Sequence, residues 1–254
     1  IDAWERFNDD CPQFIQSTIG GYCQYQIKNC SWKGEHDWQK QLLAWEKQVC
    51  DIIMQESVYS EGTIAKCCVE SINDGGELFI GNSMPIRDVD MFSLTSSKKI
   101  HIYSNRGASG IDGIISSALG MCNNSNNKNS LLLIGDVSFY HDMNGLLASK
   151  YGANLTIVVI NNSGGGIFSF LPIANSGLEN FQQYWTTDTD LKINKVADLY
   201  NCKYYFAENL NEVKKSIRES FKCKGVKIIE VKTSISKNIS AHKRMSEKVK
   251  LALI

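Results

Sequence analysis

Six short apolar runs along the chain have the length of buried β-strands. They cover residues 78–80, 100–103, 131–134, 155–160, 204–206 and 227–231. Segments with helical spacing of apolar residues lie between most of them, at 62–72, 109–121, 142–151, near 196 and at 210–221. Continuous apolar strands that alternate with helices predict a doubly wound α/β fold, in which helices cover both faces of a parallel sheet.

The first part of the chain has a different pattern. From Asp37 to Tyr59 apolar residues recur at spacings of three and four, which predicts an amphipathic helix. Residues 1–36 show little helical periodicity, and we expect them to form the edge of a preceding domain, with the α/β domain over 37–254. The first residue is Ile and no signal-peptide pattern opens the chain, so we expect a truncated or processed chain.

The composition is that of a globular protein with a substantial core, since 43% of the 254 residues are hydrophobic and 21% are charged. The 27 basic residues balance 27 acidic ones, which argues against nucleic acid or an anionic membrane as a partner. The basic tail after Lys232 could form a nucleic-acid patch or the solvated face of a helix. The second interpretation is favoured because no aromatic residues interleave with the charges.

Neither a membrane span nor a zinc site is expected. The longest apolar runs are far shorter than the roughly 20 residues that a membrane helix needs. The nine cysteines include no C-x-x-C pair and no zinc spacing with the four histidines. This cysteine usage indicates a reducing compartment.

Two predicted strands end in polar residues that point to one site. Gly135-Asp136 follows the run at 131–134, and Asn161-Asn162 follows the run at 155–160. The carboxyl ends of parallel strands meet at one edge of a sheet, where ligands bind. If the two strands are neighbours, Asp136, Asn162 and a loop carbonyl can form one side of an octahedral Mg²⁺ shell and leave the other side to phosphate oxygens.

Three glycines follow the second strand end. Gly164, Gly165 and Gly166 would let the backbone approach an anion and point successive N–H groups at it, which suits a diphosphate. The alternative is that Asp136 caps the next segment and that "NNSGGG" is a flexible loop. The carboxylate and the paired asparagines, each closing a buried strand, favour the metal-diphosphate site.

Gly-Asp followed by Asn-Asn at this interval resembles the signature of thiamine diphosphate (ThDP) enzymes such as 2-oxo acid decarboxylases, with Val137 in place of the usual third glycine. Longer stretches resemble the family of 2-succinyl-5-enolpyruvyl-6-hydroxy-3-cyclohexene-1-carboxylate (SEPHCHC) synthases, in which an apolar residue is common at that place. They are "GNSMPIRDVDMF" at 81–92, "SNRGASGIDGIISSALG" at 104–120, "GDVSFYHDMNGLLAS" at 135–149 and "INNSGGGIFSFLP" at 160–172. The resemblance covers about 37–254, the C-terminal cofactor domain of that family.

The resemblance also implies which residues form the site. The ion would be held by Asp136, Asn162 and the carbonyl of Gly164. The remaining cofactor contacts would be Gly135, Val137, Ser138, Gly165, Gly166 and Ile167. The catalytic residues would be Ser83, Arg87, Arg106 and Ile111, and the substrate contacts would be Asn82, Ser83, Arg87, Arg106, Phe168 and Leu171. Guanidinium groups suit substrates that carry several carboxylates.

For several of these residues the sequence also allows a structural role. Ser138 can cap a helix, and Arg87 can pair with Asp88 or Asp90. Ile111 can continue the buried helical stripe of 114–119. Simple core packing is the alternative for Ile167, Phe168 and Leu171.

The reaction implied by the resemblance is decarboxylation of 2-oxoglutarate and 1,4-addition of the succinyl carbanion to isochorismate, a step toward menaquinone or phylloquinone. The cofactors would be ThDP and Mg²⁺, with Mn²⁺ as the alternative. The enzyme would be a homodimer or homotetramer, with a site shared between subunits and a glutamate supplied by an N-terminal domain. Because that glutamate is not in this chain, the chain alone is expected to be inactive. The expected location is the cytoplasm of a bacterium or a plastid.

Three other functions are compatible with parts of the pattern. Another ThDP decarboxylase or an acetohydroxyacid synthase-like carboligase would consume pyruvate instead of 2-oxoglutarate. A serine hydrolase built on Ser83 or Ser109 is disfavoured because "GASG" lacks the spacing of G-x-S-x-G. A non-catalytic assembly module is disfavoured by the intact set of Asp136, Asn162 and the two arginines.

Overall fold

The computed structural model describes residues 15–31, 34, 36–94, 96–122 and 129–253. The chain forms two compact units, Ile1–Glu46 and Lys47–Ile254. The predicted domain edge at 1–36 lies partly outside the described residues. The predicted helix from Asp37 is confirmed as α2 (His36–Gln55), which runs across the boundary between the units.

The first unit contains a helix that the sequence pattern did not predict. Helix α1 (Ile19–Asn29) begins after Thr18, whose hydroxyl accepts a hydrogen bond from the backbone N–H of Gly21. None of its residues is buried. The sequence analysis found little helical periodicity in 1–36, so the helix at 19–29 is one that it missed.

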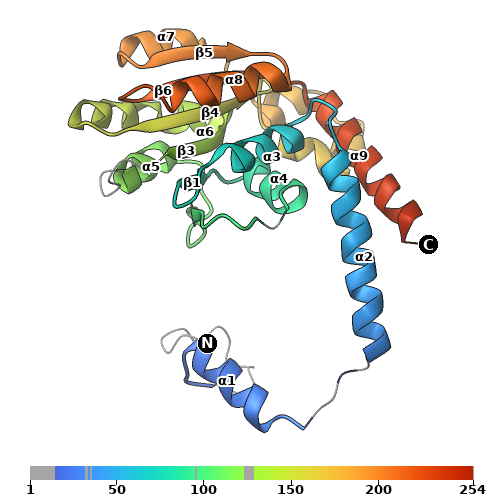
Figure 1. Cartoon of the computed structure of the whole chain (residues 1–254). Coiled ribbons are helices and arrows are strands. Elements are labelled where there is room, and N and C mark those ends of the chain that lie inside the picture. Colours follow the sequence, from blue (N-terminus) through green and yellow to red (C-terminus); the bar gives the residue numbers. More distant parts are fainter. Residues whose placement is uncertain (1–14, 32–33, 35, 95, 123–128, 254) are drawn as a thin grey trace. The chain divides into compact units, whose positions relative to one another are not determined.

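The second unit is built on a six-stranded sheet with the order β2-β1-β3-β4-β6-β5, and every neighbouring pair is parallel (Figure 1). The strands are β1 (Glu77–Ile80), β2 (His101–Tyr103), β3 (Ser130–Gly135), β4 (Leu155–Asn161), β5 (Lys203–Ala207) and β6 (Lys227–Lys232). All six predicted strands are confirmed, each within two residues of its expected bounds. The doubly wound α/β prediction is also confirmed.

Helices pack on both faces of this sheet. One face carries α3 (Glu61–Ser71), α4 (Met84–Phe92) and α8 (Leu210–Ser220). The other carries α5 (Ile114–Cys122), α6 (Asp136–Asp142), the 3₁₀ segment η1 (Met143–Tyr151) and α7 (Ile193–Leu199). Successive residues of β3 alternate between the two cores: Leu131 and Leu133 belong to the first, Leu132 and Ile134 to the second. Burial on both faces explains why the strands read as uninterrupted apolar runs.

Three helical predictions need correction. Helix α4 was not predicted. It has only nine residues, too few for a clear helical spacing of apolar positions, and Pro85 lies in its first turn. The predicted helix at 142–151 is a 3₁₀ segment that follows the separate helix α6. Helix α5 begins at Ile114 and not at 109, because Gly113 adopts φ +66° and interrupts the helical backbone.

The remaining elements connect and cover the strand ends. Short helical turns η2 (Gly166–Phe170), η3 (Pro172–Asn175) and η4 (Gln182–Thr186) fill the long connection after β4. Helix α9 (Ile235–Ala252) ends the described chain and buries Asn238, Ala241, His242 and Met245. None of the helices in the described part of the chain is long and apolar enough to cross a bilayer.

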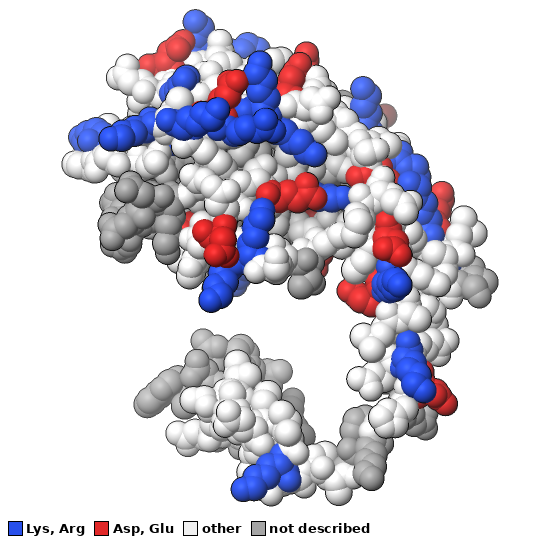
Figure 2. Space-filling model, in the orientation of Figure 1, with Lys and Arg blue, Asp and Glu red and all other residues white. Residues whose placement is uncertain are grey.

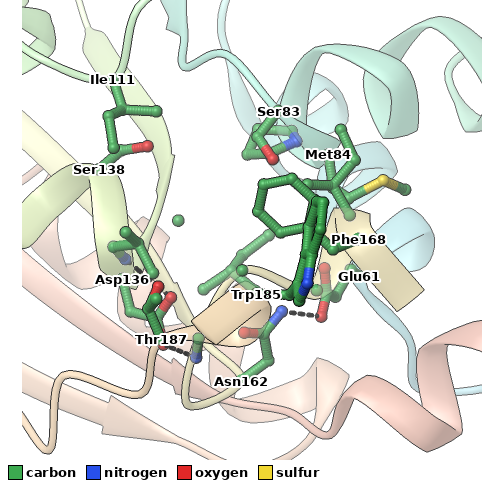
Figure 3. A pocket seen from close by; sticks show the side chains of 18 of the residues that line it. Glu61, Ser83, Met84, Ile111, Asp136, Ser138, Asn162, Phe168, Trp185 and Thr187 are labelled. Atoms are coloured by element: carbon green, nitrogen blue, oxygen red, sulfur yellow. Dashed lines mark hydrogen bonds between the residues drawn. The ribbon is translucent and has the colours of Figure 1, made fainter. Parts of the chain in front are cut away.

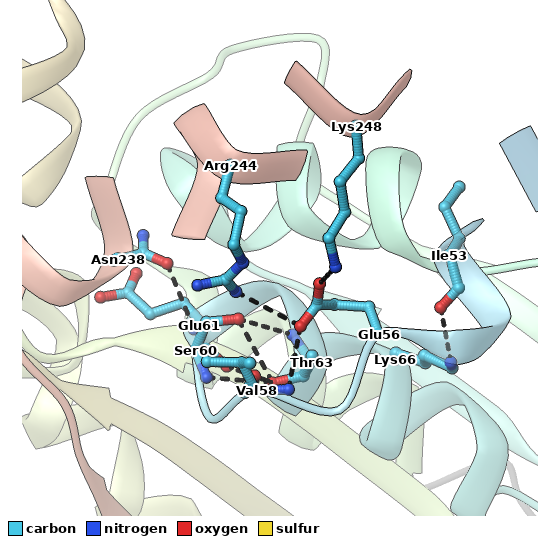
Figure 4. Close-up of polar contacts among 10 residues, drawn as sticks. All are labelled: Ile53, Glu56, Val58, Ser60, Glu61, Thr63, Lys66, Asn238, Arg244 and Lys248. Carbon is cyan, nitrogen blue, oxygen red and sulfur yellow. Dashed lines mark hydrogen bonds and ion pairs between the residues drawn. The ribbon is translucent and has the colours of Figure 1, made fainter. Parts of the chain in front are cut away.

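Basic and acidic side chains are mixed over the face of the molecule seen in Figure 2, apart from a band of Lys and Arg over α8. In the basic tail, Lys237, Lys243 and Lys250 are exposed on α9. Arg244 and Lys248 pair with Glu56, at 3.3 Å and 3.0 Å between nitrogen and carboxylate oxygen (Figure 4). The tail is thus an amphipathic helix with a solvated face, as one of the two interpretations predicted.

Candidate metal and cofactor site

The strands that carry the two predicted ligands are neighbours. β3 pairs with β4 in parallel, with Gly135 opposite Ile160. Asp136 begins α6 directly after β3, while Asn162 follows the last residue of β4. Strand β1 lies between β2 and β3, so the chain changes its winding direction there, and the site occupies the carboxyl ends of the strands beside this switch point. The geometric condition set by the sequence analysis is met.

Asp136 is buried and held by backbone donors. It is 3% exposed, and its carboxylate accepts hydrogen bonds from the N–H of Val137 at 2.8 Å and of Gly164 at 2.9 Å. These bonds fix the carboxylate but leave further lone pairs on both oxygens. They also tie the loop after β4 to the end of β3.

The side-chain amide of Asn162 has its NH₂ group hydrogen-bonded and its oxygen without a partner among the described residues. Its Nδ2 donates to Oε1 of Glu61 at 2.8 Å (Figure 3). Its Oδ1 is buried and accepts no hydrogen bond from the described residues. A buried acceptor without a donor is costly, and a cation would satisfy it. This orphaned oxygen, beside a buried carboxylate, fits a hard divalent ion.

The glycine loop has a different geometry from the one predicted. The N–H of Gly164 donates to Asp136, that of Gly165 to the carbonyl of Thr186, and that of Gly166 to the carbonyl of Gly164. These three N–H groups are therefore bonded to other parts of the protein and are not free to bind an anion. The glycines are needed for close packing: Gly164 has φ +140°, and a side chain there would collide with the carbonyl of Thr186.

Most of the predicted residues line one cavity of about 680 Å³. From the sequence analysis these are Ser83, Ile111, Gly135, Asp136, Val137, Ser138, Asn162, Gly164, Gly165, Gly166, Ile167 and Phe168. Ile111 lies before α5 and is half-buried, so it does not belong to the buried helical stripe. Ser83 adopts φ +72° at the start of α4, which is strained for a residue with a side chain.

Asn82, Arg87, Arg106 and Leu171 do not line this cavity. The Asn82 side chain is buried, donates to the carbonyls of Asn105 and Gly110, and accepts from Arg106 at 3.0 Å. Arg87 is exposed and donates to the carbonyl of Ser83 at 2.6 Å. Its suggested pairing with Asp88 is not formed, because Oδ1 of Asp88 lies 2.9 Å from Nε2 of His242.

Several cavity residues were not expected from the sequence. They are Glu61, Met84, Pro85, His141, Ile160, Tyr184, Trp185 and Thr187. The Trp185 ring contacts Phe168 edge to face, with ring centres 5.6 Å apart, and stacks with Phe181, with ring centres 6.3 Å apart. One signal in the sequence could have indicated this part of the wall. A tryptophan in the long irregular stretch after residue 160 suggests that its large apolar ring packs against other residues or a ligand.

A family described as "Thiamine pyrophosphate enzyme, C-terminal TPP binding domain" matches residues 90–231. The chain belongs to this family. The matched range begins within α4 and ends in β6, so it contains Asp136, Asn162 and the glycine loop, whereas Glu61 lies before it.

Curated relatives of this TPP-binding domain are named 2-succinyl-5-enolpyruvyl-6-hydroxy-3-cyclohexene-1-carboxylate synthase. The protein from Listeria innocua is 42% identical over 85% of this chain and 38% of its own length. The protein from Oceanobacillus iheyensis is 44% identical over 84% and 37%. The protein from Geobacillus kaustophilus is 42% identical over 97% and 43%. The chain thus spans about two fifths of the relatives that it matches.

Solved structures support the fold of the TPP-binding domain. A protein from Mycobacterium smegmatis described as "a putative thiamin diphosphate-dependent enzyme" superposes with a TM-score of 0.54 at 14% identity, over 70% of this chain and 32% of that one. Benzoylformate decarboxylase from Polynucleobacter necessarius superposes with a TM-score of 0.55 at 19% identity, over 68% and 33%.

The electrostatics of the site favour a cation. Burial raises the pKa of Asp136 to about 6 and that of Glu61 to about 7. No lysine or arginine is among the described residues that line the cavity. Within the described part of the chain no three His, Cys, Asp or Glu side chains cluster as a metal site. The cavity thus holds the buried carboxyl groups of Asp136 and Glu61 without a lysine or arginine of the described residues to balance them, which suits a bound cation.

Proposed function

We propose that this chain binds thiamine diphosphate through a divalent ion held by Asp136, Asn162 and the carbonyl of Gly164. The observation that carries the proposal is the buried Oδ1 of Asn162, which lacks a donor at the strand end next to Asp136. Mg²⁺ suits three oxygen ligands with room for two phosphate oxygens and water, and Mn²⁺ is the alternative.

The walls of the cavity suit the two ends of such a cofactor. Gly135, Val137 and Ser138 line the cavity together with the ion ligands and would contact the diphosphate. Gly165 and Gly166 also line it and would contact the diphosphate through atoms other than their N–H groups, which are bonded to Thr186 and Gly164. The apolar part of the wall is formed by Ile111, Ile167, Phe168, Met84 and Trp185. ThDP, when bound, supplies a carbon acid that adds to the carbonyl of a 2-oxo acid. The apolar residues would orient its ring and exclude water from that carbon.

For the whole protein we propose the activity that the relatives' names state, SEPHCHC synthase, a transferase that uses 2-oxoglutarate and isochorismate. Arg87, which donates to the carbonyl of the cavity residue Ser83, and Arg106, which donates to Asn82, would bind substrate carboxylates. The further substrate contacts would be Asn82, Ser83, Phe168 and Leu171. We expect a homodimer or homotetramer with a shared site. The relatives named above are bacterial, which favours the bacterial cytoplasm over a plastid.

Calorimetric titration of the chain with ThDP in excess Mg²⁺ tests the cofactor site. We expect binding by the wild type and none by Asp136→Ala. The matched control is Asp142→Ala, which removes the acid at the other end of α6; this acid accepts hydrogen bonds from Ser116 and does not line the cavity. Equal binding by the wild type and Asp136→Ala, or none by either, would reject the proposed site.

The substrate is tested separately on the full-length protein. Release of CO₂ from 2-oxoglutarate, but not from pyruvate, is the expected result in the presence of ThDP and Mg²⁺. Consumption of pyruvate instead would assign the protein to another class of ThDP enzyme. Absence of both reactions with intact cofactor binding would indicate a non-catalytic domain.

A further inference from the structure

The buried carboxylate of Glu61 contacts the amide of Asn162. Glu61 precedes residues 90–231, the range that the family matches. Glu61 is 1% exposed and opens α3, and its Oε1 accepts from Nδ2 of Asn162 at 2.8 Å. Oε1 also accepts from the hydroxyl of Thr233 at 3.1 Å, and the Glu61 N–H donates to Oδ1 of Asn238 at 3.2 Å (Figure 4). The side chain is thus held by residues that follow β4 and β6, and the backbone N–H is held by the first turn of α9.

This contact determines which end of the amide faces the site. The amide group of asparagine has a donor end and an acceptor end of nearly the same shape, so packing alone does not choose between its two orientations. An acceptor at Oε1 requires that Nδ2 point toward Glu61. The oxygen Oδ1 must then point to the opposite side, where it is buried without a donor. Only this orientation presents a ligand to a cation, because Nδ2 would repel it.

We propose that Glu61 is a positioning residue that sets the orientation of the Asn162 amide for ion binding, with Thr233 holding the Glu61 carboxylate in place. This inference rests on the proposed metal site. Its content is that Glu61 acts as a hydrogen-bond acceptor for Nδ2 and not as an ion ligand. Groups that orient metal ligands in this way typically contribute about 10- to 100-fold to metal affinity.

Binding of Mn²⁺ to the chain in the presence of ThDP, followed by the EPR signal of free Mn²⁺, tests the proposal without an activity assay. Glu61→Met keeps a similar volume but removes the acceptor, and we expect about 10- to 100-fold weaker binding. Glu61→Gln keeps an oxygen for Nδ2, so its affinity should stay within about threefold of the wild type. Equal losses in the two variants would show that the charge matters and would overturn the proposal.

A second background separates orientation from packing. In Asn162→Asp both oxygens of the side chain are acceptors, so no orientation has to be chosen. Adding Glu61→Met to Asn162→Asp should therefore not weaken Mn²⁺ binding. If Glu61→Met weakens Mn²⁺ binding as much in Asn162→Asp as it does in the wild type, Glu61 acts through packing alone, which contradicts the proposal.

Three other variants serve as the control, the substitute and the test of the metal site. Glu56→Met is the matched control, because it removes another buried glutamate close to α3, one that pairs with Arg244 and Lys248 (Figure 4). It should lower the thermal stability and leave Mn²⁺ affinity unchanged. If Glu61→Met does not fold, Thr233→Val removes only the donor to Oε1 and should weaken binding about two- to fivefold; no change would overturn the proposal. Asp136→Ala tests the metal site itself, and if it binds Mn²⁺ normally the proposed function fails, independently of Glu61.

Discussion

The N–H of Gly164 donates a 2.9 Å hydrogen bond to the carboxylate of Asp136, so the loop after β4 is tied to the end of β3. This bond holds residue 164 against the carboxylate of Asp136, so the geometry of the proposed ion site depends on the backbone at residue 164.

Gly164→Ala should destabilise the fold and abolish cofactor binding. The residue has φ +140°, and an added Cβ would collide with the carbonyl of Thr186. We expect a loss of about 2–4 kcal/mol in the free energy of unfolding, measured by urea denaturation. Gly75→Ala is the control: φ is +74° but no atom lies near the added Cβ, so the loss should be about 1–2 kcal/mol. Equal losses would show that the contact with Thr186 is unimportant.

The sheet, and the position of the two proposed metal ligands at neighbouring strand ends, were predictable from the sequence because their signals are local. Each strand is buried on both faces and reads as an apolar run, and Asp136 and Asn162 directly follow two such runs. The partner of Asn162 was not predictable, because Glu61 lies 101 positions away and only the fold brings it close. The hydrogen bond of the Gly165 N–H was missed for the same reason, since its acceptor is the carbonyl of Thr186, outside the glycine loop.

Asn82→Asp should be more harmful than Asn82→Ala. The Asn82 amide donates to the carbonyls of Asn105 and Gly110. Alanine leaves these two acceptors unpaired, which should lower the free energy of unfolding by about 1–3 kcal/mol. Aspartate places a carboxylate against two carbonyl oxygens and adds repulsion that its pairing with Arg106 only partly offsets. Urea denaturation gives the order of stability, and faster amide hydrogen exchange at 105–113 would locate the effect. The opposite order would mean that the bond to Arg106 dominates.

Trp185→Phe should remove the optical signal of cofactor binding while retaining the binding itself. The chain has five tryptophans, and Trp185 is the one that follows residue 47. It lines the cavity and packs against Phe168, so a bound ring system should quench its emission. In a fluorescence titration with ThDP and Mg²⁺, the variant should lose the change, while calorimetry should show an affinity within about tenfold because an aromatic ring remains. An unchanged fluorescence response in the variant would place the ligand elsewhere.

Lys227 should make stability rise with pH in the alkaline range. It is 2% exposed, and its ammonium donates to Oδ1 of Asn154 at 2.6 Å and to the carbonyl of Gly225 at 2.9 Å. Burial lowers its pKa from 10.5 to about 8. Between these values the unfolded chain binds the proton and the folded chain does not, so the free energy of unfolding increases with pH. The shift corresponds to roughly 3 kcal/mol at most.

Lys227→Met isolates this contribution, because other groups also titrate in the alkaline range and are common to both proteins. The variant lacks the buried ammonium, and the exposed Asn154 side chain can bond to water in its place. At about pH 7 we expect the variant to be as stable as the wild type or more stable, since the cost of burying the charge is fully present there. From pH 8 to 10.5 the wild type should gain on the variant by up to about 3 kcal/mol in urea denaturation. Parallel curves for the two proteins would show that the ammonium keeps its ordinary pKa in the folded state, which would require water to reach it beside Asn154 and Gly225.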